Sequence, residues 1–123
     1  MAKKLILVAD DDRDLVIALS IRLRAAGYEV IGAHDGDEAF EVAHEQKPDL
    51  VIMDIRMPAG GGFDSTDRLK HSLSTRNIPV IFLTAFDDED MREQARSLGC
   101  AGYFRKPFDD AEFMESIRTV LGS

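Results

Sequence analysis

Short uninterrupted apolar runs alternate along this chain with stretches of helical periodicity, and this alternation restricts the possible folds more than any other feature. The clearest runs are residues 5–9, 50–53 and 80–83. A run without polar interruptions is typical of a strand that is covered on both faces of its sheet. Weaker strand candidates lie at 28–33 and 101–104. The sequence therefore predicts five strands.

Apolar residues recur at helical spacing in the intervals between these strands. Helices are expected around residues 15–23, 39–43, 64–74, 91–98 and 113–121. The third has only Leu69 and Leu73 as a clear apolar stripe, and the acidic run at 87–90 is expected to be a solvated start of the fourth. Asp12 or Asp14 is expected to cap the first helix.

Five strands alternating with five helices predict an α/β fold, in which a doubly wound parallel sheet has helices on both faces. Parallel neighbours need crossover connections, and the helices supply them. Sheets of this kind bind ligands at the carboxyl ends of their strands. With 123 residues, of which 45% are hydrophobic, the chain is expected to form one domain spanning 1–123.

Charge and cysteine content narrow the possible partners and the compartment. The 23 acidic and 15 basic residues give a net charge of −8, which disfavours binding to the phosphate backbone of nucleic acids. The single cysteine cannot form an internal disulfide and suits a reducing cytoplasm. The apolar run 5–9 is too short for a signal-peptide core or a membrane span. We therefore expect a cytoplasmic protein without nucleic-acid binding or membrane insertion.

Polar residues of a particular kind follow the predicted strands. Asp10 and Asp11 follow the first strand, Asp54 the third, Thr84 the fourth and Lys106 the fifth. Because the carboxyl ends of parallel strands meet at one edge of the sheet, these side chains are expected to converge. Clustered carboxylates raise each other's pKa, and a divalent cation removes that cost. Oxygen ligands, without histidine or thiolate at zinc spacing, favour Mg²⁺.

The same residues are suited to phosphoryl transfer. Next to a metal ion, one carboxylate can act as a nucleophile and form an aspartyl phosphate. The transferring group carries negative charge on three equatorial oxygens. Mg²⁺, the Lys106 ammonium, and the Thr84 hydroxyl with nearby backbone N–H groups can each neutralise one of these oxygens.

Five motifs, in order and covering nearly the whole chain, resemble the receiver domain of two-component response regulators, in size like the stand-alone chemotaxis type. They are LVADDD at 7–12, MDIRMP at 53–58, PVIFLTA at 79–85, GCAGY at 99–103 and KPF at 106–108. The resemblance implies a flavodoxin-like (βα)5 fold with strand order 2-1-3-4-5. It also implies a cis bond between Lys106 and Pro107.

Carried over residue by residue, the resemblance implies that Asp54 is the phosphoacceptor and Lys106 the phosphate-binding cation. Asp10, Asp11 and Asp54 would bind Mg²⁺, together with the backbone carbonyl of Arg56. Such a domain is not an enzyme that acts on other substrates. It nevertheless catalyses its own phosphoryl transfer and its later autodephosphorylation.

The resemblance also implies a switch, with Thr84 as the switch hydroxyl and Tyr103 as the switch aromatic. The phosphoryl donor would be a sensor histidine kinase or a histidine phosphotransfer protein. The surface of the fourth helix, fifth strand and fifth helix would pass the signal to a downstream protein. Phe86, two residues after Thr84, is expected to lie with Arg56 over the phosphoryl site and to hinder attack by water.

The chain departs from the usual pattern of this family at two places. The loop after Pro58 usually has an acidic residue before a glycine, whereas here it reads Ala-Gly-Gly-Gly at 59–62. Consecutive glycines are costly to order, so this loop is expected to be mobile or of a different shape. The residue after the three aspartates is often proline and here is Arg13.

Two other functions fit the acidic cluster. A phosphorylation-independent interaction module with the same fold would bind Mg²⁺ without accepting phosphate from small donors. A magnesium-dependent phosphatase would turn over p-nitrophenyl phosphate. Such phosphatases usually have Asp-x-Asp after the first strand and a cap insertion, whereas here the candidate nucleophile Asp54 follows the third strand.

Overall fold

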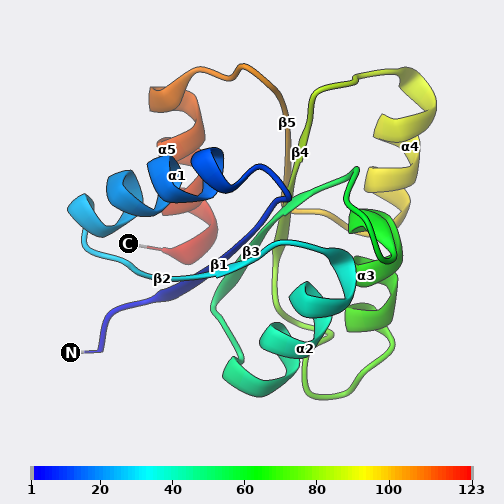
Figure 1. The fold of residues 1–123 in the computed structure, drawn as a ribbon, viewed down its shortest axis with the longest axis horizontal. Helices are drawn as coiled ribbons and strands as arrows, with labels where there is room; N and C mark the ends of the chain where they lie inside the picture. The colour runs from blue at the N-terminus through cyan, green and yellow to red at the C-terminus, as the bar shows by residue number, and fades with distance from the viewer. Residues whose placement is uncertain (1, 123) are drawn as a thin grey trace.

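The computed structural model describes residues 2–122 and has five strands alternating with five helices (Figure 1). The strands are β1 (Leu5–Ala9), β2 (Glu29–Ala33), β3 (Leu50–Asp54), β4 (Val80–Thr84) and β5 (Gly102–Arg105). The helices are α1 (Arg13–Ala25), α2 (Gly36–Gln46), α3 (Gly61–Lys70), α4 (Glu89–Ser97) and α5 (Asp110–Leu121). All strands are parallel, in the order β2-β1-β3-β4-β5. The predicted fold class and strand order are confirmed.

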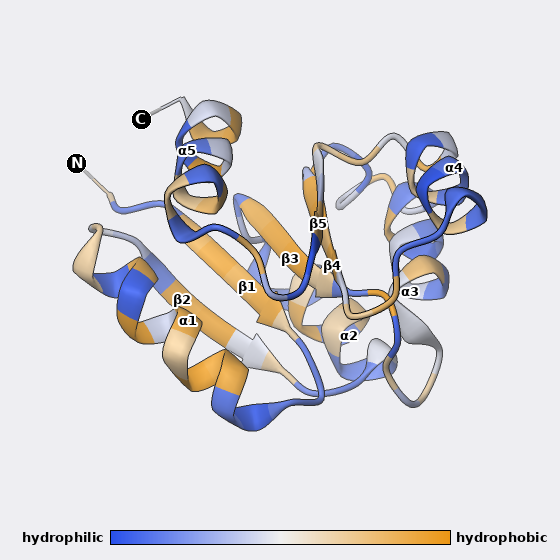
Figure 2. Cartoon of the chain, turned by 90° about the horizontal axis from the view of Figure 1, so that it is seen from above, coloured by the Kyte–Doolittle hydropathy of each residue, from blue (hydrophilic) through white to orange (hydrophobic). Residues whose placement is uncertain are grey.

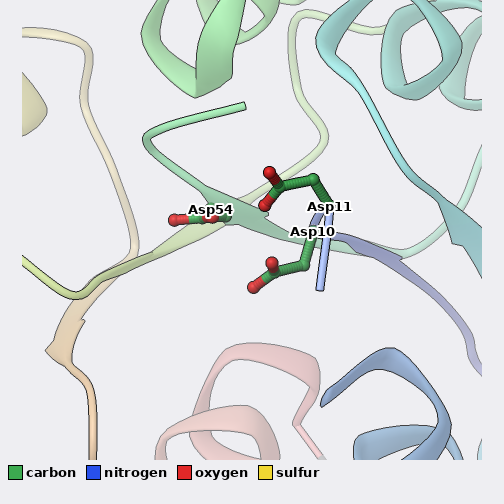
Figure 3. Close-up of side chains that lie close together, drawn as sticks. All are labelled: Asp10, Asp11 and Asp54. Carbon is green, nitrogen blue, oxygen red and sulfur yellow. The ribbon is translucent and has the colours of Figure 1, made fainter. Parts of the chain in front are cut away.

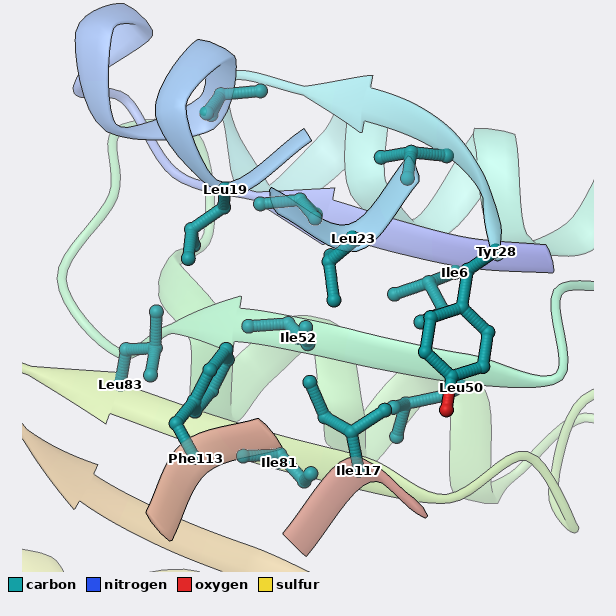
Figure 4. Close-up of a cluster of buried hydrophobic side chains, with 13 residues drawn as sticks. Ile6, Leu19, Leu23, Tyr28, Leu50, Ile52, Ile81, Leu83, Phe113 and Ile117 are labelled. Atoms are coloured by element: carbon teal, nitrogen blue, oxygen red, sulfur yellow. The ribbon is translucent and has the colours of Figure 1, made fainter. Parts of the chain in front are cut away.

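Helices cover both faces of the sheet, with α1 and α5 on one face and α2, α3 and α4 on the other (Figure 1). Successive side chains of a strand point to opposite faces. Ile6 and Ile52 therefore pack toward α1 and α5 (Figure 4), whereas Leu7 and Met53 belong to the core on the other face. This arrangement explains why β1, β3 and β4 are apolar along most of their length (Figure 2). Within residues 2–122, none of the helices has both the length and the apolar character that a bilayer crossing requires.

The register of the sheet aligns the strand ends that carry the polar residues. β1 pairs with β3 so that Asp10 falls level with Asp54. β4 pairs with β5 so that Thr84 lies beside Arg105, the residue before Lys106. The strand ends that carry Asp10, Asp54, Thr84 and Lys106 consequently belong to one edge of the sheet, although these residues come from distant parts of the chain.

The third helix differs from its prediction, because it spans Gly61–Lys70 rather than 64–74. The buried Thr75 hydroxyl donates to the Leu69 carbonyl at 2.8 Å and satisfies an acceptor at the helix end. The chain turns after this point, and Leu73, which was expected on the apolar stripe, is 81% exposed. Of the predicted pair, only Leu69 is part of the core.

The glycine-rich loop closes tightly on the end of β3, and α3 begins inside it. Gly60 and Gly61 have left-handed backbone conformations, with φ of 100° and 57°. The Gly62 N–H donates to the Ile55 carbonyl at 2.8 Å. A Cβ at Gly62 would lie 2.2 Å from the Asp54 carbonyl oxygen. Close packing of the loop against β3 therefore explains why glycine is needed here despite the entropic cost of ordering it.

Candidate functional site

Three carboxylates converge at the carboxyl edge of the sheet (Figure 3). Asp54 is the last residue of β3, and Asp10 and Asp11 follow β1. Each contributes a carboxylate oxygen, and these oxygens all lie within 4.8 Å of one another. Asp10 and Asp54 are buried, with 0% and 6% of their surface exposed, whereas Asp11 is exposed. The structure thus brings together the three acids that the sequence singled out.

Lys106 reaches this cluster from the segment after β5. Its Nζ donates to the Asp10 carboxylate at 2.6 Å and lies 3.6 Å from a carboxylate oxygen of Asp54. Burial lowers the pKa of the Lys106 ammonium, but the hydrogen bond to Asp10 and the charges of both acids outweigh it, so the pKa is raised overall. Lys106 therefore stays charged between two buried carboxylates. Its bond to Pro107 is cis, as the resemblance implied.

The Asp54 carboxyl is strongly perturbed by these surroundings. Burial, followed by the charge of Asp10, raises the pKa of Asp54 from 3.8 to about 6. The charge of Lys106 and a 3.4 Å hydrogen bond from the Arg56 N–H act in the opposite direction but are weaker. A buried carboxyl beside another carboxylate is costly to ionise, and the cost falls when a cation lies next to it.

The donor set of the cluster fits a magnesium ion. Three ionised carboxylates and one ammonium leave a local charge of −2, from −3 and +1. A divalent cation would balance this charge, and carboxylate oxygens are the hard ligands that Mg²⁺ prefers. The exposure of Asp11 leaves one side open to solvent, where retained waters or a phosphate oxygen can complete an octahedral shell.

The Thr84 hydroxyl is bonded within its own loop rather than to the acids. It donates to the Phe86 carbonyl and accepts from the Phe86 N–H at 3.0 Å. On the rim, the Arg56 guanidinium lies over the Phe86 ring, 4.4 Å from the ring centroid. The Phe86 side chain is otherwise mostly exposed, at 57% of the residue surface. The structure therefore pairs Arg56 with Phe86, while a role of the Arg56 carbonyl as a metal ligand stays a prediction.

Asp87 is a residue whose surroundings the sequence reasoning missed. It belongs to the acidic run that was expected to be solvated, but its side chain is only 12% exposed. Arg92 of α4 donates to both of its carboxylate oxygens, at 2.7 and 2.5 Å. The same guanidinium lies 5.5 Å from the centroid of the Tyr103 ring. Asp87 precedes the helix and is five residues from Arg92, so the usual helical spacing of ion pairs does not point to it.

Comparison with known proteins places this site in a family. The sequence model of the response regulator receiver domain matches residues 6–118. The chain is a response regulator receiver domain. Among its relatives, this receiver domain is 37% identical over 122 residues to the polar-differentiation response regulator DivK of Brucella ovis, an alignment that covers 99% of this chain and 98% of that protein.

A second relative is longer than this receiver domain. The transcriptional regulatory protein PdtaR of Mycobacterium tuberculosis is 41% identical over 117 residues, which are 94% of this chain and 56% of that protein. The chain thus spans little more than half the length of PdtaR. Membership of the receiver domain family supports a phosphorylation-dependent signalling role for the chain.

Solved receiver domains have the same architecture. The chemotaxis protein CheY4 of Vibrio cholerae superposes with a TM-score of 0.90 at 28% identity, covering 98% of this chain and 100% of that chain. The receiver domain of the sensor histidine kinase PA1611 of Pseudomonas aeruginosa superposes with a TM-score of 0.89 at 31% identity, covering 99% of this chain and 100% of that chain. The PA1611 structure has a magnesium ion coordinated in its active site cleft.

Proposed function

We propose that this receiver domain accepts a phosphoryl group on Asp54 from a phosphohistidine of a sensor histidine kinase or a histidine phosphotransfer protein. The observation that carries the proposal is the convergence of Asp10, Asp11 and Asp54 around one point, with the Lys106 ammonium beside them. This arrangement would supply a nucleophile, oxygen ligands for a metal ion and a cation for the phosphate oxygens.

The chemistry follows from these positions. An oxygen of the ionised Asp54 attacks the phosphorus atom, the new O–P bond forms, and the N–P bond to the donor imidazole breaks, so that the imidazole leaves with the electron pair. Asp10, Asp11 and Asp54 would hold Mg²⁺, which supplies a positive charge for the phosphoryl oxygens. The PA1611 receiver domain, with its bound magnesium, supports this assignment. Lys106 is held 3.6 Å from Asp54, where its charge stabilises a second oxygen.

Phosphorylation then changes the hydrogen bonds of Thr84. In the structure its hydroxyl is bonded to the Phe86 backbone, and a phosphoryl oxygen on Asp54 offers a charged, stronger acceptor. A shift of Thr84 toward Asp54 leaves room for Tyr103, which lies on the neighbouring strand. The surface of α4, β5 and α5 changes as a consequence and signals to a downstream protein.

The test is incorporation of phosphate from acetyl phosphate, with and without Mg²⁺, followed by mapping of the modified residue. We expect acid-stable, base-labile labelling that requires Mg²⁺ and is abolished in Asp54→Asn. Asp64→Asn, which removes an exposed carboxylate from the first turn of α3, should label like the wild type. Undiminished labelling of Asp54→Asn would refute the proposal that Asp54 accepts the phosphoryl group. Magnesium binding without labelling of the wild type would favour the phosphorylation-independent interaction module instead.

A further inference from the structure

The ion pair between Asp87 and Arg92 differs from the other ion pairs outside the acidic cluster. In the part of the chain that the structure describes, both partners of each of those other pairs are at least 45% exposed. The Asp87 side chain is 12% exposed, and Arg92 holds it with two hydrogen bonds. A bidentate pair, in which one guanidinium donates to both oxygens of one carboxylate, has a defined geometry as well as a favourable charge interaction.

This pair covers the ring of Tyr103. The Arg92 guanidinium lies 5.5 Å from the ring centroid, within the range of a cation–π interaction. The Tyr103 side chain, which is half-buried, also packs against the core cluster on the α2, α3 and α4 face of the sheet. Tyr103 therefore contacts both the core and a cation whose own position depends on Asp87.

Among the residues that the structure describes, Tyr103 has no well-formed hydrogen bond in this position, although its hydroxyl lies close to the Asp87 carboxylate. Its hydroxyl oxygen is covered, and within residues 2–122 it has no partner in hydrogen-bonding geometry. Burial raises the pKa of the Tyr103 phenol, and the nearby negative charge of Asp87 raises it further. A covered hydroxyl without a well-formed hydrogen bond is unfavourable, so the position of the ring depends on packing and on the neighbouring Asp87–Arg92 pair.

Tyr103 and Thr84 share one face of the sheet. Tyr103 pairs with Phe82, and Thr84 lies two residues further along the same strand, so the two side chains are diagonal neighbours. A movement of Thr84 therefore changes the space next to the Tyr103 ring. The Asp87–Arg92 pair contacts the same ring through the Arg92 guanidinium.

We propose that Asp87 and Arg92 are positioning residues for the switch, and that their ion pair holds Tyr103 in its resting position until Thr84 moves. The inference rests on the proposed phosphorylation switch. It adds a residue pair that favours the resting position of Tyr103 over its alternative position in the unphosphorylated protein. Loosening the pair gives Tyr103 access to its alternative position without phosphorylation. The pair contacts Tyr103 and not the phosphoryl group. Its loss therefore changes the position of the Tyr103 ring directly and affects phosphoryl transfer at Asp54 only indirectly.

Fluorine NMR of the 3-fluorotyrosine-labelled protein tests this directly. The chain has two tyrosines, so the spectrum contains one signal for Tyr103 and one for Tyr28, which packs in the core on the α1 and α5 face and serves as an internal reference. Wild-type protein with Mg²⁺ and beryllofluoride defines the activated position of the Tyr103 signal. In untreated Arg92→Gln we expect this signal to move toward that position, with at least a threefold rise in the activated-like population.

Matched variants separate the proposed role from a general effect on folding. Asp87→Asn should move the Tyr103 signal in the same direction, and Arg92→Lys should restore part of the wild-type position because it keeps the charge. Arg96→Gln, which breaks the exposed pair of Arg96 with Glu93 on the same helix, should leave the signal unchanged. An unchanged Tyr103 signal in both Arg92→Gln and Asp87→Asn would overturn the inference, as would an equal shift in Arg96→Gln.

The two proposals fail in different ways. If beryllofluoride leaves the wild-type Tyr103 signal unmoved, the phosphorylation switch fails, and with it the function of the pair. If beryllofluoride moves the signal but the Arg92 and Asp87 variants do not, the switch stands and the positioning role is rejected. If Arg92→Gln does not fold, the Arg92→Lys and Asp87→Asn spectra decide the question.

Discussion

Asp54 carries a carboxyl that the folded chain makes difficult to ionise. Between its ordinary pKa of 3.8 and the raised value of about 6, the folded protein keeps a proton that the unfolded chain has released. The contribution of Asp54 to stability therefore falls as the pH rises through this window. Above it, the ionised carboxylate opposes folding in the absence of a metal ion.

We therefore predict that Asp54→Asn stabilises the metal-free protein at pH 7 by roughly 2 kcal/mol, because raising the pKa from 3.8 to about 6 costs about 3 kcal/mol of folding free energy at this pH and the buried amide offsets part of the gain. At pH 4 the difference from the wild type should be small, because Asp54 is protonated in the folded state. Urea unfolding between pH 4 and 8, with a chelator present, measures this. A stabilisation that does not depend on pH would contradict the explanation, and Asp64→Asn provides the exposed control.

Phe86 and Arg56 form the second residue-scale feature of the rim. Their side chains stack beside the site, with the guanidinium 4.4 Å from the ring centroid, and this stack should hinder the attack of water on a phosphoryl group at Asp54. We predict that Phe86→Ala shortens the lifetime of the phosphorylated form about threefold or more, as measured by the decay of the labelled protein after donor removal. Phe86→Leu keeps an apolar side chain and should have a smaller effect. An unchanged decay rate in Phe86→Ala would reject the shielding role.

At the scale of elements, the loop between β3 and α3 connects the phosphoacceptor to a helix. α3 begins at Gly61, and the backbone of Gly62 contacts that of Asp54 so closely that a Cβ would lie 2.2 Å from its carbonyl oxygen. Backbone atoms cannot rotate away as a flexible side chain can, so any side chain at this position must displace the end of β3.

We predict that Gly62→Ala destabilises the fold by about 1–3 kcal/mol and slows labelling by acetyl phosphate at least tenfold, because the Asp54 carboxylate shifts from its place. Gly99→Ala is the matched control: Gly99 has a positive φ of 72° but no atom within 4 Å of an added Cβ. It should lose only about 1–2 kcal/mol for the left-handed conformation and label at the normal rate. Normal labelling of Gly62→Ala would show that the contact does not position Asp54.

For the whole molecule, the acidic edge of the sheet links metal binding to stability. A ligand that binds only the folded state stabilises it, by about 2.7 kcal/mol at a concentration 100-fold above its Kd. We predict that Mg²⁺ raises the melting temperature at pH 7, and that this gain disappears as the pH falls below about 6, where Asp54 takes up a proton. Thermal unfolding with added Mg²⁺ and with chelator measures the gain.

The control for this prediction is a monovalent salt at the same ionic strength. The chain has a net charge of −8, so any salt relieves some of its self-repulsion. A rise with Mg²⁺ that is no larger than the rise with NaCl, or that persists in Asp10→Asn, would contradict specific binding at the carboxylates.

The helices and strands of this fold could be predicted from the sequence because the patterns that indicate them are local. Five apolar runs and the helical spacing between them predicted the parallel α/β sheet, and the polar residues after four of these runs predicted which side chains lie at the same edge. Asp12, one of two cap candidates, accepts a hydrogen bond from the Leu15 N–H and starts α1. Patterns of this kind depend on neighbours within a few residues, so sequence alone carries them.

What required the tertiary structure were contacts between distant residues. The Lys106 ammonium meets Asp10 across 96 positions of sequence, and only strand order and register determine such a distance. The end of α3 at Lys70 also depends on such a contact, the hydrogen bond from the buried Thr75 hydroxyl to the Leu69 carbonyl. A third example is the ion pair of Arg92 with Asp87, which leaves the Asp87 side chain only 12% exposed although the acidic run around it was expected to be solvated. Local preference selects helices and strands, whereas burial and charge pairing arise only when separate elements pack together, and those interactions decide how the site is held.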